Sequence, residues 1–256
     1  MNPEEKTQLI TKLLAIYNDK DIKKSKLEFK DLLKKSNPDK DFIIQLITAS
    51  KSYMILQLIP DKFRKNKEVA LAAVKTHGNA LKYVSTELRN DEEIVKTAVS
   101  SYGHALFYAS DYWKDNEEVA YRAIKKDWSA FSSVSPRLKE DKDFIIFALS
   151  EHGDNIKFLS QELKEDPELV KLAINTSGTA LYHISEKYKN DESLVLLAVE
   201  HDSNNLRHAS LDIKREVGKD NPNPALQIKA KLLKQSLEEK IKCIPVKSNL
   251  IIKKKI

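Results

Sequence analysis

Histidine and serine are the residues of this sequence best suited to acid–base or nucleophilic chemistry. The six histidines are His77, His104, His152, His183, His201 and His208. An imidazole can bind a metal ion or transfer a proton near neutral pH, but neither an HExxH nor a CxxC motif accompanies these residues. His183 and His208 share a repeated position that otherwise holds mostly Tyr or Phe. We therefore expect them to pack like aromatic residues with a polar edge, and a metal or acid–base role is the alternative.

Serine recurs every 25 residues, at Ser85, Ser110, Ser135, Ser160, Ser185 and Ser210. A catalytic nucleophile would be needed once, so the recurrence favours helix capping. The five glycines form no phosphate-binding loop, and one cysteine, Cys243, can form neither an internal disulfide nor a cysteine-based zinc site. We find no single polar constellation typical of an active site. The sequence predicts a protein that is not an enzyme, with no cofactor, no metal site and no catalytic residues.

The elements that position these residues form a strict repeat. Six ungapped repeats of 25 residues begin at Asn66, Asp91, Asn116, Asp141, Asp166 and Asp191. Their eighth residue is invariant: Ala73, Ala98, Ala123, Ala148, Ala173 and Ala198. Apolar residues at positions four, five and nine give helical spacing around this alanine. We expect the alanine to mark a close approach of neighbouring helices.

Each repeat is predicted to be a helix pair with a corner turn. Asp or Asn should cap the first helix, and glycine at position thirteen (Gly78, Gly103, Gly153, Gly178) should end it in a left-handed C-cap. A second helix of two turns or fewer follows, and the serine then caps one more helical turn. One such repeat cannot bury its apolar face alone, so the repeats must stack into an all-α solenoid.

The chain ends are expected to cap this stack. An imperfect seventh repeat covers residues 39 to 65, with an insertion near Ser50 to Ser52. We expect an N-terminal helical cap over residues 1–38, the repeat array over 39–215, and a capping helix, Ala225 to Ile241, with a basic tail over 216–256. No apolar run is long enough to span a bilayer and no secretory signal is visible.

The repeat resembles the family known as domain of unknown function 4116 (DUF4116). The pattern D-x-E-V-x-x-x-A-V…G-x-A-L-x-Y-x-S-x-x-L carries the resemblance, is clearest in Asp91 to Asn116, and covers roughly residues 39 to 215. The resemblance implies an α-helical repeat array of undefined activity. It provides no catalytic residues to transfer.

The net charge of +6 is unevenly distributed, being −3 over residues 39–215 and +6 over 216–256. A solenoid that binds RNA needs a cationic track and stacking residues at one place in each repeat. Position seventeen comes nearest, with Lys82, Lys157 and Arg207, and we expect no consistently basic column. The charge distribution therefore argues against nucleic acid as a partner of the array. The Lys-rich tail, with Leu250 to Ile252 beside Lys253 to Lys255, is either a solvated terminus or a weak contact for anionic surfaces.

Aromatic residues are concentrated between Tyr102 and Phe131, where eight of the 19 in the chain lie. Phe107 and Tyr121 stand in columns where other repeats carry Lys, and Trp128 replaces the corner glycine. These three residues are the predicted partner-binding residues, and local repacking is the alternative. The sequence favours a protein–protein interaction module in the cytoplasm. A bacterial regulatory factor, or one delivered into a host cell, with a ligand or nucleic-acid site on the solenoid surface is the alternative.

Overall fold

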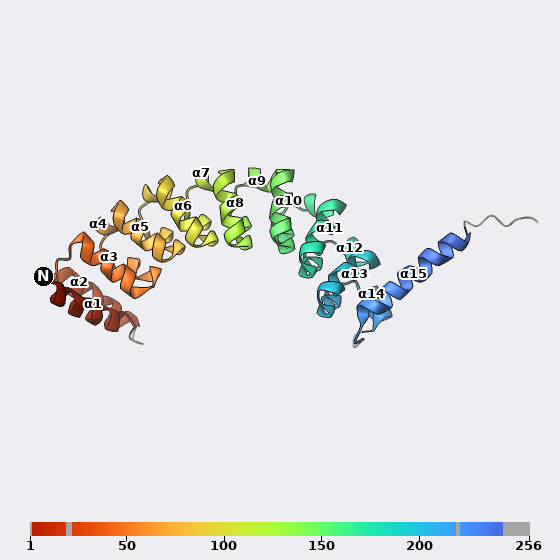
Figure 1. Ribbon diagram of the computed structural model, residues 1–256, viewed down its shortest axis with the longest axis horizontal. Helices are drawn as coiled ribbons and strands as arrows, with labels where there is room; N and C mark the ends of the chain where they lie inside the picture. Colours follow the sequence, from red (N-terminus) through yellow and green to blue (C-terminus); the bar gives the residue numbers. More distant parts are fainter. Residues whose placement is uncertain (1, 19–21, 219–220, 243–256) are drawn as a thin grey trace, which may run out of the picture. The chain divides into compact units, whose positions relative to one another are not determined.

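The computed structural model describes residues 2–18, 22–218 and 221–242 (Figure 1). Within these ranges every regular element is helical and no strand occurs. The chain divides into two compact units, Met1–Leu159 and Ser160–Ile256. No helix in the described ranges combines the length and apolar content needed to cross a membrane. Cys243 and the Lys-rich tail lie outside the described residues.

Every repeat contains an α-helix, a 3-10 helix and a short helical turn in the same order. The imperfect repeat holds α3 (Lys40–Ser50), η1 (Tyr53–Gln57) and α4 (Asp61–Arg64). The other repeats of the first unit hold α5 (Lys67–Thr76), η2 (Gly78–Tyr83) and η3 (Leu88–Asn90); α6 (Glu92–Ser101), η4 (Gly103–Tyr108) and α7 (Asp111–Lys114); α8 (Glu117–Lys126), η5 (Trp128–Ser133) and α9 (Pro136–Glu140); and α10 (Lys142–Glu151) with η6 (Gly153–Phe158). The second unit contains η7 (Leu163–Glu165), α11 (Pro167–Thr176), η8 (Gly178–His183), α12 (Glu186–Lys189), α13 (Glu192–His201), η9 (Ser203–His208), α14 (Leu211–Val217) and α15 (Pro224–Lys242).

The Asp and Asn residues that open the repeats cap the long helices, as predicted. The Asn66 side chain accepts a hydrogen bond from the Val69 amide at 3.1 Å, and Asp91 accepts one from Ile94 at 3.1 Å. These oxygens satisfy backbone N–H groups that have no partner inside the helix. Because a cap depends on residues three apart, the sequence alone defines where each helix begins.

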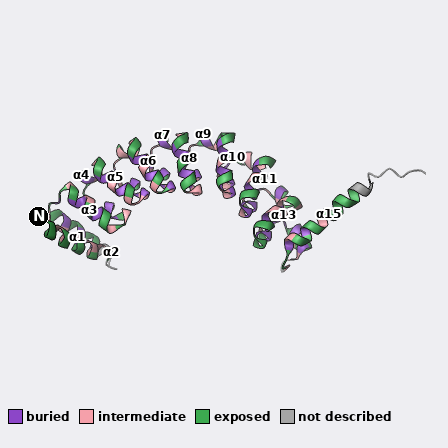
Figure 2. Cartoon of the chain, in the orientation of Figure 1, coloured by how far each residue is buried: buried purple, intermediate pink, exposed green. Residues whose placement is uncertain are grey.

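The core of each repeat is built from the apolar columns, and within each compact unit successive long helices pack side by side. In the first unit α5 contacts α3 and α6, and α8 contacts α6 and α10. All six column alanines are fully buried, and Figure 2 shows buried residues on the helices of both units. The expected all-α repeat architecture is therefore confirmed.

The glycine column has a different cause from the predicted left-handed cap. The helix before Gly78 ends at His77, whose φ of −161° is extended, and among the described glycines only Gly218 has a positive φ. A Cβ added at Gly78 would lie 2.2 Å from the Ala98 carbonyl oxygen of the next repeat. At Gly103 the same distance to the Ala123 oxygen is 2.2 Å. The left-handed cap prediction was wrong, because glycine here permits close contact between repeats.

The N-terminal segment, where a helical cap is expected, contains two helices. Helix α1 covers Pro3–Tyr17 and α2 covers Ile22–Lys35, and α1 packs against α2 and α3. The predicted insertion coincides with Lys51, which ends α3 in a left-handed conformation with φ of 51°. The division into two caps and a seven-repeat array stays a prediction.

Candidate functional site: an aromatic patch

The three predicted partner-binding residues differ in their surroundings. Phe107, near the end of η4, exposes 55% of its surface. Tyr121, on α8, is half-buried, and its ring centroid lies 4.9 Å from that of Phe144 and 4.4 Å from that of Phe147. Trp128, the first residue of η5, is also half-buried, and its ring stacks on His152 at 4.0 Å. Each ring contacts other side chains, and no ring contact joins any two of the three. Phe107 is the most exposed of them.

Phe107 belongs to a cluster of rings on one repeat, which we call the aromatic patch: Tyr102, His104, Phe107 and Tyr108. The His104 and Phe107 rings are nearly parallel, with centroids 5.8 Å apart, and Phe107 meets Tyr108 edge-on at 5.1 Å. Tyr102 lies 6.2 Å from His104 and is 37% exposed. Ring stacking therefore holds Phe107 in position while leaving much of its surface accessible.

A row of rings from the preceding repeats continues the patch. His77 lies between Tyr53 and Tyr102, with centroid distances of 4.7 and 5.1 Å. The Lys82 ammonium lies 5.7 Å from the centre of the Tyr108 ring, which is cation–π geometry. The patch thus combines exposed apolar surface with one adjacent positive charge.

Five of the six histidines contact aromatic rings, and His201 instead lies with its Nε2 atom 3.0 Å from the Asn175 carbonyl oxygen. His77 and His104 stack as described above, while His183 and His208 lie 5.0 and 5.2 Å from the Tyr182 ring. Burial and the neighbouring Arg207 lower the pKa of His208. In the described ranges no group of three His, Cys, Asp or Glu side chains could hold a metal ion. The predicted aromatic-like contacts of His183 and His208 are confirmed.

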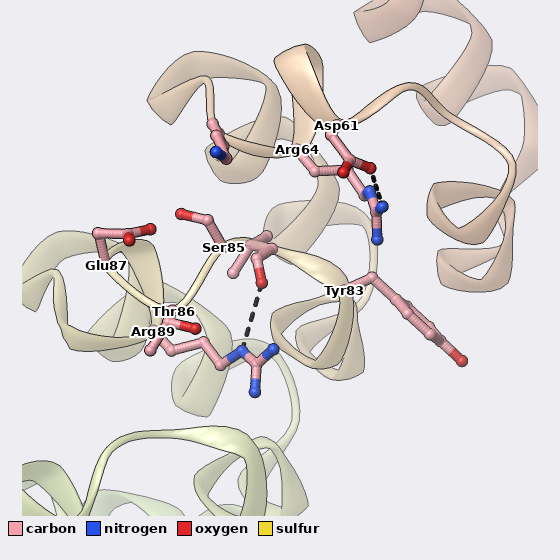
Figure 3. A pocket seen from close by; sticks show the side chains of 9 residues that line it. Asp61, Arg64, Tyr83, Ser85, Thr86, Glu87 and Arg89 are labelled. Carbon is pink, nitrogen blue, oxygen red and sulfur yellow. Dashed lines mark hydrogen bonds and ion pairs between the residues drawn. The ribbon is translucent and has the colours of Figure 1, made fainter.

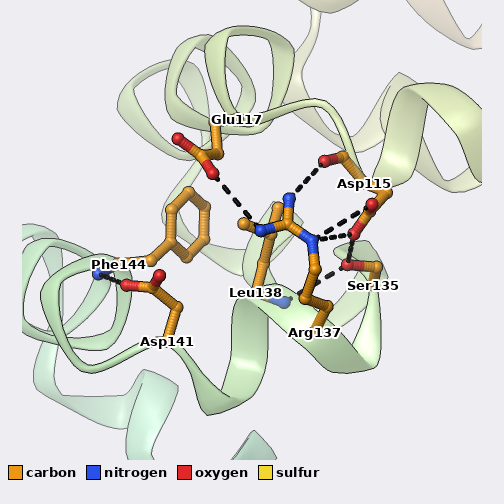
Figure 4. Close-up of polar contacts among 7 residues, drawn as sticks. All are labelled: Asp115, Glu117, Ser135, Arg137, Leu138, Asp141 and Phe144. Carbon is orange, nitrogen blue, oxygen red and sulfur yellow. Dashed lines mark hydrogen bonds and ion pairs between the residues drawn. The ribbon is translucent and has the colours of Figure 1, made fainter.

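Ser135, Ser160 and Ser210 of the serine column accept the hydrogen bond of a cap, whereas Ser110 and Ser185 do not. Ser135 accepts from the Leu138 amide at 3.3 Å and donates to the Asp115 carboxylate (Figure 4). Arg137 binds the same carboxylate through Nε at 3.0 and 3.1 Å. These interactions join consecutive repeats, and the Ser135 hydroxyl, followed by Arg137, lowers the pKa of Asp115. The predicted capping is confirmed at Ser135, whereas Ser110 makes no cap bond and donates instead to Asn90 at 2.6 Å.

A polar groove of about 260 Å³ lies between the imperfect repeat and the next one (Figure 3). Asp61 pairs with Arg64 at one side, and Arg89 Nε donates to the Val84 carbonyl at 3.3 Å on the other. A hydrogen bond from Ser85 lowers the pKa of the Glu87 carboxyl in the same groove. Neither His nor Cys lines it, so the groove has no side chain that ordinarily titrates near neutral pH.

A second, larger concavity of about 470 Å³ lies where α2 meets η1 and α4. Leu33, Leu58 and Phe63 line it together with Lys30 and Lys62. Leu33, Leu58, Ile59 and Phe63 are each less than a tenth exposed. Phe107, at 55%, and Tyr102, at 37%, are more exposed than any of these four side chains.

Sequence reasoning missed one column: position twenty-four is basic in every repeat. Its members are Arg64, Arg89, Lys114, Lys139, Lys164, Lys189 and Lys214. The expectation of no consistently basic column is therefore wrong, and a residue-by-residue comparison of the repeats would have found it. Lys114 pairs with Asp111 at 3.1 Å, while Lys139 donates to the Ser132 carbonyl at 2.7 Å, and burial lowers the pKa of Lys139. These two lysines bind a carboxylate or a carbonyl near the end of a short helix, which is a structural role.

Comparison with known proteins agrees with the repeat register. The sequence profile of the domain of unknown function DUF4116 matches residues 39–89, 66–114, 91–139, 116–164 and 166–214. Each match begins at the first residue of a repeat and spans about two repeats. No curated protein and no solved structure matches the chain. The matches cover most of the chain, which therefore belongs to the DUF4116 family.

Proposed function

We propose that this chain is a non-enzymatic protein-binding module that binds its partner through the aromatic patch. The observation that carries the proposal is the exposure of Phe107, which is 55% accessible although it is stacked on His104. Large exposed aromatic side chains in a rigid setting are typical of interface hot spots, because little conformational entropy is lost when a partner covers them.

Variation along the repeat supports the same surface. Position seventeen, which holds Phe107, varies between basic, aromatic and small polar residues: Lys82, Phe107, Ser132, Lys157, Tyr182 and Arg207. The neighbouring position sixteen is apolar in every repeat and is buried. A repeat protein builds its scaffold from uniform buried columns and its recognition surface from variable exposed ones. The partner segment should present an apolar side chain to Phe107 and a carboxylate to Lys82.

Capture from native lysate tests the proposal, using the full chain as bait. Phe107→Ala should lose a protein that the unaltered chain retains. Tyr112→Ala is the matched control, because Tyr112 is 66% exposed on α7 of the same repeat but lies outside the patch, and it should retain that protein. Equal retention by the unaltered chain and both variants would count against the patch. Retention of RNA or DNA in place of protein would favour the nucleic-acid alternative. Whether the chain acts in the cytoplasm or after delivery into a host cell stays a prediction.

A further inference from the structure

Helix α15 carries two apolar faces, and the array covers only one of them. Ile228 is 2% exposed. It lies on the face that α15 turns toward the rest of its own compact unit, where the helix packs against α13, α14 and η9. On the opposite side Leu226 and Leu233 are each 63% exposed, and Leu237 is 50% exposed. Figure 2 shows much of the helix as exposed. The prediction that this helix covers the end of the array therefore accounts for only one face.

The exposed face has the spacing of a two-helix interface. Leu226, Ala230, Leu233 and Leu237 follow one another at intervals of four, three and four residues. These intervals are the alternating a and d positions of a heptad, which form one stripe that packs against a partner helix. A surface helix of a monomer needs only the face that it turns toward its own core, and among the described residues the leucines of this second stripe stay largely exposed.

We propose that the exposed stripe of α15 binds the same stripe of a second copy of the chain, with the two helices antiparallel. In that arrangement Leu226 packs against Leu237 of the other copy, and Ala230 packs against Leu233. Each leucine then meets either another leucine or the smaller Ala230. The contacts repeat around a twofold axis, as an isologous interface requires. A parallel pair would set Ala230 against Ala230 and leave a gap between the helices.

The charges beside the stripe favour the same orientation. In a parallel pair Lys229 of one copy would lie beside Lys234 of the other on both sides of the interface, because these are the g and following e positions. In the antiparallel pair Lys229 lies near Ser236 and Lys234 lies near Gln227. No like charges then meet across the interface.

The described lysines of α15 also argue against a membrane as the occupant of the stripe. Lys229 pairs with Glu200 and Lys231 pairs with Glu192 within the chain, and Lys234 lies 4.0 Å from Glu238. A helix that binds an anionic membrane needs its positive charges free for lipid headgroups. Here they are directed toward carboxylates.

Sedimentation velocity of the full chain tests the self-association. Four pairs of side chains along two helices form a small contact, and specific interfaces begin at about 1,200 Å² of buried surface. We therefore expect a reversible dimer with a dissociation constant on the order of 10–100 µM. Leu233→Glu should weaken the dimer at least tenfold. Gln235→Glu adds the same charge to an exposed position of the same helix turn outside the stripe and should leave the dimer unchanged. Circular dichroism would verify that both variants fold. A chain that is monomeric at several hundred micromolar, or equal weakening by both variants, would overturn the proposal.

Disulfide trapping tests the orientation, with Cys243→Ser as the background. Chains carrying Ala230→Cys and chains carrying Leu233→Cys should cross-link when mixed, because these positions face each other in the antiparallel pair and a disulfide requires Cα atoms within about 7 Å. A tag on one chain identifies the mixed product. Cross-linking of each variant with itself, and not with the other, would indicate a parallel pair and overturn the orientation.

Vesicle binding tests the competing occupant. Vesicles of phosphatidylcholine and phosphatidylserine should retain the unaltered chain and Leu233→Glu to the same extent. If the unaltered chain is monomeric and Leu233→Glu alone loses vesicle binding, the stripe binds a membrane and the self-association proposal fails.

Discussion

Replacement of Gly103 by alanine tests why the repeats contain a glycine column. The added Cβ would lie 2.2 Å from the Ala123 carbonyl oxygen and 2.9 Å from both the Cβ and the amide nitrogen of Asp127. Ordinary contact between such atoms is roughly 3.5 Å, so the next repeat must move by about 1 Å. Overpacking of this kind costs about 1–3 kcal/mol, and we expect about 3 kcal/mol because two of the three contacts are with backbone atoms. Since 1 kcal/mol lowers the melting temperature of a chain this size by about 2–4 °C, the midpoint should fall by about 6–12 °C.

A second variant separates this cause from a left-handed cap. Asparagine is the residue that most often replaces glycine in a left-handed C-cap, so a cap would tolerate Gly103→Asn better than Gly103→Ala. Close contact between repeats predicts the reverse order, because asparagine is larger than alanine. Thermal unfolding of both variants, followed by circular dichroism at 222 nm, distinguishes the two. A melting temperature of Gly103→Asn at or above that of Gly103→Ala would refute the close-contact account.

Three further predictions concern caps, rings and charge. Ser135→Ala should lower the free energy of unfolding by about 1 kcal/mol and by more than Ser110→Ala, because Ser135 caps a helix and Ser110 does not. Urea titration checks this, and equal losses would contradict it. Trp128→Ala should lower the free energy of unfolding by about 1–3 kcal/mol, because it removes a stacked, half-buried ring, and should leave the affinity of a patch-bound partner unchanged. Calorimetry of unfolding and of binding measures both quantities. Lost affinity with unchanged stability would show that Trp128 contacts the partner directly. The lowered pKa of Asp115 means that its stabilising contribution is present above the unfolded pKa of about 3.9 and is lost as the pH falls through the folded pKa. Asp115→Asn should therefore make the melting temperature less dependent on pH below about pH 4, and an unaltered pH dependence would contradict this.

Local patterns made the helices predictable. The cap between Asn66 and Val69 and the buried alanines follow from residues within one turn of each other, and the structure confirms them. The reason for the glycines was not accessible in the same way, because Gly103 contacts the Ala123 carbonyl in the following repeat. Position twenty-four was visible in the sequence, but its role depends on partners such as Asp111 and the Ser132 carbonyl, which only the folded chain brings into contact.

The candidate site was predictable in region but not in membership. The sequence located the aromatic residues between Tyr102 and Phe131, yet Phe107 and Tyr121 both replace a lysine and differ in burial. Tyr121 packs against Phe144 and Phe147 of the next repeat, whereas Phe107 rests on His104 of its own repeat and keeps one face exposed. The two residues occupy different positions of the repeat, seventeen on a 3-10 helix and six on a long helix, and the contacts that cover position six come from the following repeat.

The affinity of the captured partner for the unaltered chain, Phe107→Ala and Tyr112→Ala tests the central proposal most directly. Titration calorimetry should show a loss of about 2 kcal/mol or more, on the order of 30-fold, for Phe107→Ala and a change of less than about twofold for Tyr112→Ala. An unchanged affinity for Phe107→Ala, or an equal loss for both variants, would contradict the proposal that the aromatic patch binds the partner.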